Sequence, residues 1–251
     1  MIQISNVTKS YQDKKVVNNV SLMIPKGKLT SFIGPNGAGK STLLSIMSRL
    51  MPSEEGEVLI EGKKLEEWKP NQLAKKMAVL RQNNHLNLRL TIRQLVSFGR
   101  FPHSGGRMKE EDEEKVDEAI SYMQLQDIEH KYLDELSGGQ RQRAYIAMVL
   151  AQNSDYILLD EPLNNLDMKH SVEIMKILQK LTRELGKTVI IVIHDINFAS
   201  CYSDYIVALK EGIIEKEGTS EELIEEKVLS TIYEIPFKVQ QIEKQKVCIY
   251  Y

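Results

Sequence analysis

A strand, a glycine-rich loop and a helix follow one another near the amino terminus, and this feature restricts the fold most strongly. The apolar run KLTSFI leads into GPNGAGKST, and helix-forming residues continue to a stop at Pro52. Glycines let the backbone curl so that successive N–H groups point at phosphate oxygens, helped by the positive end of the helix. The pattern predicts an α/β fold in which a strand opens into a phosphate-binding loop.

Two side chains of this loop carry the expected chemistry. Lys40 can reach the β- and γ-phosphates of a nucleotide, and the Ser41 hydroxyl can ligate Mg²⁺. A glycine turn with a surface lysine is the alternative, but it leaves the flanking strand and helix unexplained. We therefore expect a nucleoside triphosphate site, and its remaining candidate residues are Gly34, Pro35, Asn36, Gly37, Ala38, Gly39 and Thr42.

Acidic residues end a later apolar strand, YILLDEP. Asp160 lies at its carboxyl end, where ligands bind in open α/β sheets, and Mg²⁺ needs such a carboxylate. Glu161 is placed to polarise a water that attacks the γ-phosphate. His194 ends the next strand, TVIIVIHD, and is either structural or a contact of the γ-phosphate. Together with the loop, these residues predict a nucleotide-hydrolysing site.

The rest of the chain alternates between strand and helix patterns. The first sixty residues or so resemble short strands, and GEVLIEGKKL alternates apolar and polar residues as an antiparallel strand does. In EDEEKVDEAISYMQL, the apolar residues recur at i, i+3, i+4 and i+7 and predict an amphipathic helix: Val116, Ala119, Ile120 and Met123. AYIAMVLAQ predicts a buried helix. Residues 170–185 predict a third helix, whose apolar side consists of Ile174, Met175, Leu178, Leu181 and Leu185. The segment YIVALKEGIIEKEGT predicts a hairpin, followed by a helix that Thr219 and Glu222 cap.

Composition excludes several classes of protein. A net charge of −2 does not favour nucleic acid as a partner, which usually requires a basic excess. Cys201 and Cys248 are far apart and not in metal-ligand spacing, so we expect reduced thiols. The first residues have no signal-peptide pattern, and the longest apolar runs are strand-sized. We expect a chain outside the bilayer that reaches a membrane only through a partner.

In order along the chain, these motifs resemble the ATP-binding cassette (ABC) family, the ATPase subunits of ABC transporters. The resemblance covers about residues 1–220 and includes GPNGAGKST, LSGGQRQR, YILLDEP and NNLD. It implies an α/β fold with a P-loop NTPase core of the RecA type, an antiparallel β subdomain and an inserted helical subdomain. A single domain over 1–251 would comprise core and β subdomain at about 1–85 and 152–251, and the helical subdomain at about 86–151.

The resemblance also implies roles for individual residues. Tyr11 is similar to the aromatic residue that stacks on adenine, with a strand-edge tyrosine as the alternative. Gln82 resembles the glutamine that meets Mg²⁺ and the attacking water and senses the membrane partner, although Arg81 stands where the family often has proline. Asp167 resembles the aspartate of the loop that links two nucleotide sites, and His194 the switch histidine.

The signature LSGGQ explains why a second phosphate-loop-like segment is present. In this family two copies pack head to tail, and each ATP lies between the P-loop of one copy and the signature of the other. Ser137, Gly138, Gly139 and Gln140 would thus bind the partner's ATP. Ser137 also fits a capping box with Gln140, and both functions can hold together because capping aims the helix amides outward.

The resemblance implies a peripheral ATPase on the cytoplasmic face of the cell membrane. It would act as a homodimer bound to separate transmembrane permease subunits and, indirectly, to a substrate-binding protein. VSFGRFPH resembles the G-R-x-P segment of iron-siderophore and vitamin B12 importers, so we expect a ferric-siderophore importer. Other metal-chelate or cobalamin importers, an exporter, and a soluble ABC protein stay open. A P-loop kinase or GTPase would leave LSGGQ without a function.

The permease contact is expected between Gln82 and about Arg107, in a groove that would receive a short cytoplasmic helix. The apolar candidates there are Leu86, Leu88, Leu90 and Phe101, with subdomain core as the alternative for each. The tail after about Glu222 combines a helix-like start with a strand-like end, and no function is assigned to it.

Overall fold

The computed structural model of the protein describes residues 1–82, 88–164, 166–243 and 245–250. The chain divides into two compact units. The first combines residues 1–68 with 178–251, and the second spans 69–177, so the boundary falls within one helix, α7 (Met168–Arg183). The predicted subdomain boundaries at about 86 and 151 stay a prediction.

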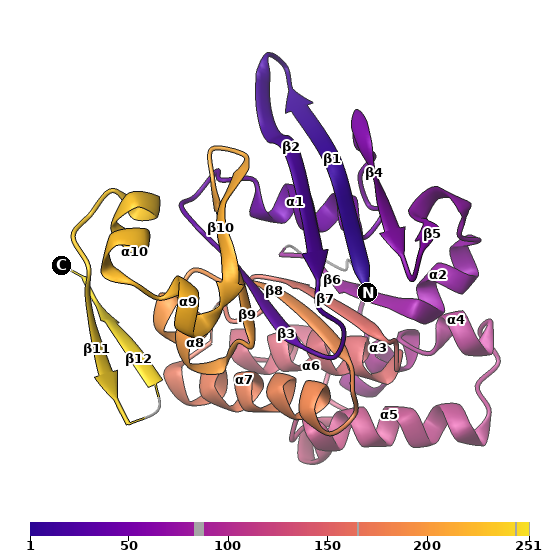
Figure 1. Cartoon of the computed structure of the whole chain (residues 1–251). Coiled ribbons are helices and arrows are strands. Elements are labelled where there is room, and N and C mark those ends of the chain that lie inside the picture. Colours follow the sequence, from indigo (N-terminus) through magenta and orange to yellow (C-terminus); the bar gives the residue numbers. More distant parts are fainter. Residues whose placement is uncertain (83–87, 165, 244, 251) are drawn as a thin grey trace. The chain divides into compact units, whose positions relative to one another are not determined.

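The first unit contains an antiparallel sheet at the start of the chain (Figure 1). Its strands are β1 (Ile2–Tyr11), β2 (Lys14–Ile24), β4 (Glu55–Ile60) and β5 (Lys63–Lys64), with the 3₁₀ turn η1 (Leu65–Glu67) after them. β1 pairs with β2 on one side and β4 on the other, both antiparallel. The alternation in GEVLIEGKKL therefore predicted an antiparallel strand correctly, although β1 and β2 are longer than the short strands we expected.

Parallel strands of the first unit bring the phosphate loop into place. β3 (Leu29–Ile33) pairs in parallel with both β8 (Thr188–Val192) and β9 (Tyr205–Lys210). All residues of β3 and β8 are buried, which explains why both strands are continuous apolar runs. β10 (Ile213–Thr219) returns antiparallel to β9, so the predicted hairpin is confirmed.

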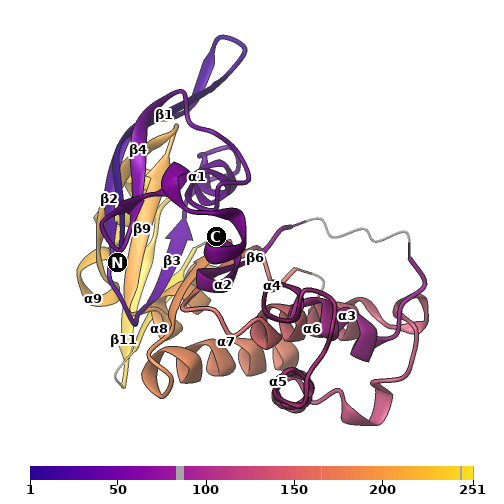
Figure 2. The same ribbon diagram turned by 90° about the vertical axis from the view of Figure 1, so that its right-hand side faces the viewer.

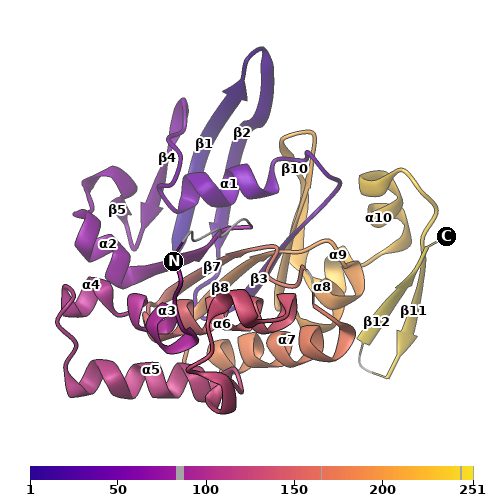
Figure 3. The same ribbon diagram turned by 180° about the vertical axis from the view of Figure 1, so that it is seen from behind.

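Helices and a terminal hairpin complete the first unit. They are α1 (Lys40–Met47), α8 (Ile196–Tyr202), α9 (Ser220–Leu223), α10 (Glu226–Tyr233) and the strands β11 (Lys238–Ile242) and β12 (Gln245–Ile249). Thr219 caps α9 in a capping box with Glu222, as the sequence predicted. Figure 3 shows the β11–β12 hairpin beside α10 at the carboxyl end of the chain.

The second unit is mostly helical. It contains α2 (Pro70–Lys76), β6 (Met77–Leu80), α3 (Ile92–Phe98), α4 (Phe101–Ser104), α5 (Glu110–Tyr122), η2 (Gln126–Ile128), η3 (Leu133–Glu135), α6 (Gly138–Ala151) and β7 (Tyr156–Asp160). Helices α3, α5 and α6 pack on one another (Figure 2), and β6 pairs with β7 in parallel. Val116, Ala119, Ile120 and Met123 are buried, so the predicted amphipathic helix is confirmed in α5.

One helix differs from its predicted bounds. The helix expected over residues 170–185 is α7, which begins at Met168 and ends at Arg183. Ile174, Met175 and Leu178 are fully buried, as their spacing predicted. Leu185 lies beyond the helix end and is 51% exposed, so its predicted place on the apolar side was wrong.

Candidate nucleotide-binding site

The loop between β3 and α1 adopts a backbone that requires glycine at two positions. Gly34 has φ +137°, and a Cβ there would lie 2.0 Å from the carbonyl oxygen of Leu209. Gly39 has φ +96°, and a Cβ there would lie 2.3 Å from the carbonyl oxygen of Val16. Any side chain at either position would therefore collide with backbone as well as strain the dihedral angle.

The amine of Lys40 lies over this loop. Lys40 is buried, and its Nζ donates hydrogen bonds to the carbonyl oxygens of Gly34 at 2.7 Å and Pro35 at 2.8 Å. Lys40 also begins α1, whose N-cap Gly39 offers no side-chain cap. A buried ammonium group and a helix N-terminus converge here, and both attract phosphate. The other loop residues differ in accessibility: Asn36 and Gly37 are exposed, Pro35, Ser41 and Thr42 half-buried, and Ala38 buried.

Tyr11 and His194 belong to the same unit. Tyr11 is the last residue of β1, its side chain is 47% exposed, and its hydroxyl donates to Sδ of Met51 at 3.1 Å. His194 is exposed and follows β8, which is tied to β3 by the bond from the N–H of Ile193 to the carbonyl of Phe32. Both side chains are thus accessible to a ligand of this unit.

In the second unit, Gln82 and Glu161 meet. Nε2 of Gln82 donates to Oε2 of Glu161 at 2.6 Å, and Nδ2 of Asn164 donates to the same oxygen at 2.5 Å. Glu161 has φ +50°, in the left-handed region that costs energy for a side chain with a Cβ. Asp160, just before it, ends β7 and is buried. The sequence had not predicted the contact of Asn164, which lies three residues from Glu161.

The signature segment forms the start of α6. Ser137 is its N-cap: Oγ accepts the N–H of Gln140 at 3.2 Å, and Oε1 of Gln140 accepts the N–H of Ser137 at 3.1 Å. The predicted capping box is therefore confirmed. Ser137 and Gly138 are exposed, while Gly139 lies against Leu166, with 3.4 Å between Cδ2 of Leu166 and a Cβ built on the glycine.

Asp167 has a structural function at the start of α7. Its Oδ1 accepts the N–H of His170 at 2.9 Å and lies 2.8 Å from Nδ1 of the same residue. The hydrogen bond from this N–H is the main reason why the pKa of Asp167 is lowered. The sequence pattern did not predict this contact and indicated only a loop between nucleotide sites for Asp167.

The residues present fit a nucleotide and a magnesium ion. The glycine-lined loop, the Lys40 amine and the N-terminus of α1 suit a triphosphate. Asp160 offers a buried carboxylate at the end of a strand. Among the described residues, no group of three or more His, Cys, Asp or Glu side chains could hold a metal. Mg²⁺ usually binds one or two carboxylates together with substrate phosphates.

The predicted site residues are divided between the two units. Tyr11, the loop residues 34–42 and His194 lie in the first unit, and Gln82, residues 137–140, Asp160, Glu161 and Asp167 lie in the second. The structure brings Gln82 to Glu161 and Lys40 onto its own loop. Cys201 is a half-buried and Cys248 a buried free thiol.

Comparison with known proteins gives similarities over most of the chain. The family model described as "ABC transporter" matches residues 17–164. The petrobactin import ATP-binding protein YclP of Bacillus subtilis (strain 168) is 61% identical over 251 residues, covering 100% of both chains. The petrobactin import ATP-binding protein FatE of Bacillus anthracis is 50% identical, covering 95% of this chain and 96% of the relative.

Solved structures agree with these sequence relatives. The dimeric structure of MJ0796, described as a bacterial ABC transporter cassette, superimposes with a TM-score of 0.80 at 37% identity. The match covers 88% of this chain and 99% of that one. The predicted α/β fold of the P-loop NTPase type is thereby confirmed.

Proposed function

The chain belongs to the ABC transporter ATP-binding family, and from that membership we propose that it powers the import of a ferric siderophore, petrobactin or a close analogue. It binds ATP and is an ATPase. Importer subunits of this family dimerise and work with separate membrane permease components. The cargo proposal is carried by one observation, the 61% identity to a petrobactin importer subunit along the whole of both chains.

In the first unit, we assign the triphosphate to the glycine loop. Lys40 would exchange its two carbonyl contacts, to Gly34 and Pro35, for the β- and γ-phosphate oxygens. The exposed ring of Tyr11 would stack on adenine, and His194 would contact the γ-phosphate. Ser41, Gln82 and Asp160 would hold Mg²⁺, which neutralises phosphate charge when bound.

Glu161 is the proposed general base for the attacking water. The side-chain amides of Gln82 and Asn164 both donate hydrogen bonds to Oε2 of Glu161. An amide N–H can only donate, so this oxygen acts as the acceptor in both bonds. Both amides thus donate to the carboxylate, the group that would accept a proton from the attacking water. They also fix the orientation of the group, so that Glu161 does not have to be ordered during hydrolysis.

For the second half of each ATP site, we propose the signature of a second copy of this chain. The capping box pairs the side chains of Ser137 and Gln140 with each other's backbone N–H groups at the start of α6. Ser137 and Gly138 remain exposed. An anion from a partner copy can bind at this helix N-terminus. Asp167 would lie in the loop that connects the two sites of such a head-to-tail homodimer.

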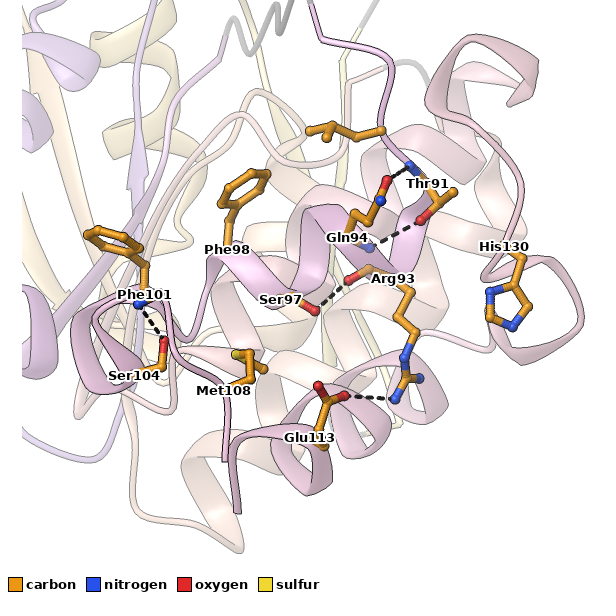
Figure 4. Close-up of a pocket in the computed structure, with 12 residues that line it drawn as sticks. Thr91, Arg93, Gln94, Ser97, Phe98, Phe101, Ser104, Met108, Glu113 and His130 are labelled. Atoms are coloured by element: carbon orange, nitrogen blue, oxygen red, sulfur yellow. Dashed lines mark hydrogen bonds and ion pairs between the residues drawn. The ribbon is translucent and has the colours of Figure 1, made fainter. Parts of the chain in front are cut away.

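The permease contact is proposed at a pocket of about 690 Å³ in the second unit. The rings of Phe98 and Phe101 stand toward one end of the pocket, and Arg93 and His130 toward the other (Figure 4). Phe98 is 50% exposed and Phe101 61%, which is unusual for aromatic side chains on a surface without a partner. Of the predicted groove residues, Leu88 is exposed, Leu90 is half-buried, and Leu86 lies outside the described residues.

Charge around this pocket favours a basic partner segment. In the first turn of α5, Glu110 and Glu111 are exposed, whereas Asp112 is buried against Arg100. Arg93 is already bound to Glu113, Asp117 and Glu129. Cytoplasmic segments of membrane proteins carry an excess of Lys and Arg. An amphipathic, basic segment of the permease therefore fits this surface in both polarity and charge.

The location of the protein follows from these partners. No helix of the described residues is long and apolar enough to cross a bilayer. We propose that the subunit lies on the cytoplasmic face of the membrane, held by the permease. A substrate-binding protein would act on it only through the permease, and the net charge of −2 favours no nucleic acid partner.

Trapping of the closed pair tests the nucleotide mechanism. Size-exclusion chromatography with light scattering should show a dimer of Glu161→Gln with ATP and a monomer without it, because hydrolysis is blocked. Adding Ser137→Arg should abolish the dimer, whereas Ser121→Arg, a matched change on the exposed face of α5, should not. A monomer under all conditions, despite measured ATP binding, would contradict the shared site.

Two further experiments test the partner and the cargo. Phe98→Asp with Phe101→Asp should abolish co-purification with the permease, while Ile213→Asp, at an exposed residue of β10, should leave it intact. In cells that lack the chain, the wild type and not Glu161→Gln should restore uptake of radioactive iron supplied as ferric petrobactin. Restored uptake of only cobalamin or another chelate would contradict the cargo assignment.

A further inference from the structure

The carboxyl-terminal segment, residues 226–243 and 245–250, is attached to the rest of the first unit by hydrogen bonds. Asn197 of α8 donates to the carbonyl of Cys248 at 3.1 Å and accepts the N–H of Cys248 at 2.7 Å. Oγ of Ser200 donates to the carbonyl of Lys246 at 2.6 Å. β12 is thus fixed along α8, the helix that follows His194, and Figures 1 and 3 show α10 next to this hairpin.

An aromatic cluster holds α10 against the hairpin. The ring of Phe237, which is buried, lies 5.7 Å from that of Tyr233 and 5.2 Å from that of Tyr250, measured between centroids. Burial raises the pKa of Tyr233 far above its ordinary value, so its phenol stays neutral at any physiological pH. The last residue of α10 is therefore fixed in position and carries a neutral hydroxyl group.

This hydroxyl reaches the phosphate-binding loop. Oη of Tyr233 accepts the N–H of Gly34 at 3.0 Å, across 199 positions of sequence. The carbonyl of Gly34 accepts Nζ of Lys40, so both polar groups of this residue are bound. Gly34 is also in close contact with the backbone of Leu209, where a Cβ would not fit. The loop is thus held at its first residue, where the chain leaves β3.

We propose that Tyr233 is a positioning residue for nucleotide binding, which fixes the entry of the phosphate loop from the carboxyl-terminal segment. It acts through Gly34 and does not touch the nucleotide. Without the phenol oxygen, the Gly34 N–H loses its acceptor and the loop spends part of its time in conformations that do not match the phosphates. The apparent dissociation constant for ATP then equals the intrinsic constant divided by the fraction of molecules whose loop is competent to bind.

The size of the effect is limited by a single hydrogen bond. A neutral bond of this kind contributes about 1 kcal/mol, and a tenfold change corresponds to ~1.4 kcal/mol. Tyr233→Phe should therefore raise the dissociation constant and the KM for ATP by about two- to fivefold. The kcat should remain that of the wild type, because Lys40, Glu161 and His194 are unchanged. Tyr250→Phe is the matched control, since it removes a phenol of the same cluster that has no bond to the loop in the described part of the chain.

Hydrogen exchange distinguishes positioning from a general structural effect. In Tyr233→Phe, a peptide that covers residues 33–42 should exchange faster, while peptides of α8 and β12 should exchange as in the wild type. The thermal midpoint should stay within about 1 °C of the wild type, because the aromatic packing is kept. ATP affinity is measured by calorimetric titration of the full chain, and KM and kcat with the permease bound.

Three outcomes would overturn the proposal. Wild-type ATP affinity in Tyr233→Phe would show that the bond does not matter for binding. An equal loss in Tyr250→Phe, or faster exchange throughout the tail, would indicate general destabilisation. The inference depends on the glycine loop as the nucleotide site. If the wild type itself bound no ATP, the family function would fail first, and the exchange data would still report the Tyr233 contact.

Discussion

A buried ion pair in the second unit leads to a prediction with a large expected effect. Arg100 and Asp112 are 4% and 5% exposed, and both Nε and a terminal nitrogen of Arg100 lie 2.9 Å from Oδ1 of Asp112. Arg100 also donates to the carbonyl of Ala151 at 2.9 Å. One guanidinium group thereby connects the end of α3 with α5 and α6. Asp112→Asn keeps the shape of the side chain but leaves the buried positive charge without its counter-ion.

The expected loss follows from the burial of both partners. Removing one member of a buried pair costs about 3–5 kcal/mol, because the remaining charge stays desolvated. In a chain of this length, each kcal/mol lowers the melting temperature by about 2–4 °C. Asp112→Asn should therefore melt roughly 6–20 °C below the wild type in a calorimetric or circular dichroism scan. Glu118→Gln, which breaks the exposed pair with Lys115 on the same helix, should cost at most about 1 kcal/mol.

A double-mutant cycle tests the reasoning. Arg100→Met should also destabilise the protein, because it leaves Asp112 buried and unpaired. Arg100→Met combined with Asp112→Leu removes both charges and should be clearly less destabilised than the sum of the single changes. Strictly additive losses, or a melting temperature of Asp112→Asn within about 2 °C of the wild type, would refute the assignment of this energy to the ion pair.

The same pair predicts a pH dependence. Burial alone would raise the pKa of Asp112, but the N–H of Lys109 and the guanidinium of Arg100 outweigh it and lower the pKa. Because the folded pKa lies below the unfolded value of about 3.9, the contribution is fully present above that pH and is lost as the pH falls through the folded pKa. The stability gap between the wild type and Asp112→Asn should be constant near neutral pH and narrow only in strong acid.

Three further predictions concern other positions. Gly99→Ala should destabilise the fold by about 1–3 kcal/mol in urea titrations, because its Cβ would lie 2.1 Å from the carbonyl of Met148; helix propensity alone predicts a gain. Burial raises the pKa of Cys248 to about 11, so at pH 8 iodoacetamide should label Cys201 well before Cys248 in mass spectra, and equal rates would contradict this. Tyr11→Ala should weaken ATP binding about five- to tenfold and Tyr11→Phe little, if the ring stacks on adenine; unchanged affinity in Tyr11→Ala would refute stacking.

Local patterns in the sequence predicted the elements whose causes are local. The spacing of Val116, Ala119 and Ile120 predicted the buried face of α5, and the pair Ser137 and Gln140 predicted the cap of α6. The strand–loop–helix pattern predicted the glycine loop before any contact was known. Periodicity, caps and turns act over a few residues, so they can be recognised without the tertiary structure.

Contacts between distant segments could not be predicted in this way. Nothing in the neighbourhood of Tyr233 indicates that its hydroxyl binds Gly34, and Arg100 looks like an ordinary surface residue in the sequence. Leu185 continues the apolar spacing of α7, but the helix ends at Arg183 and Gly186 adopts φ +62° shortly afterwards. The turn at Gly186 therefore ends the helix, although the apolar spacing of the sequence continues to Leu185.

The contacts of the segment Gly99–Pro102 explain physically why these residue types stand there. Gly99 lets the end of α3 approach the backbone of α6, Arg100 fixes that end to α5 and α6, and Pro102 lies in the first turn of α4. Phe101, between them, is left exposed at the pocket to which we assign the permease. Under that assignment, these residues shape the surface that is offered to the permease, and none of them needs to contact the cargo. If the permease binds at this pocket, the G-R-x-P segment would report the cargo only indirectly, because the permease and not the ATPase subunit would contact the chelate.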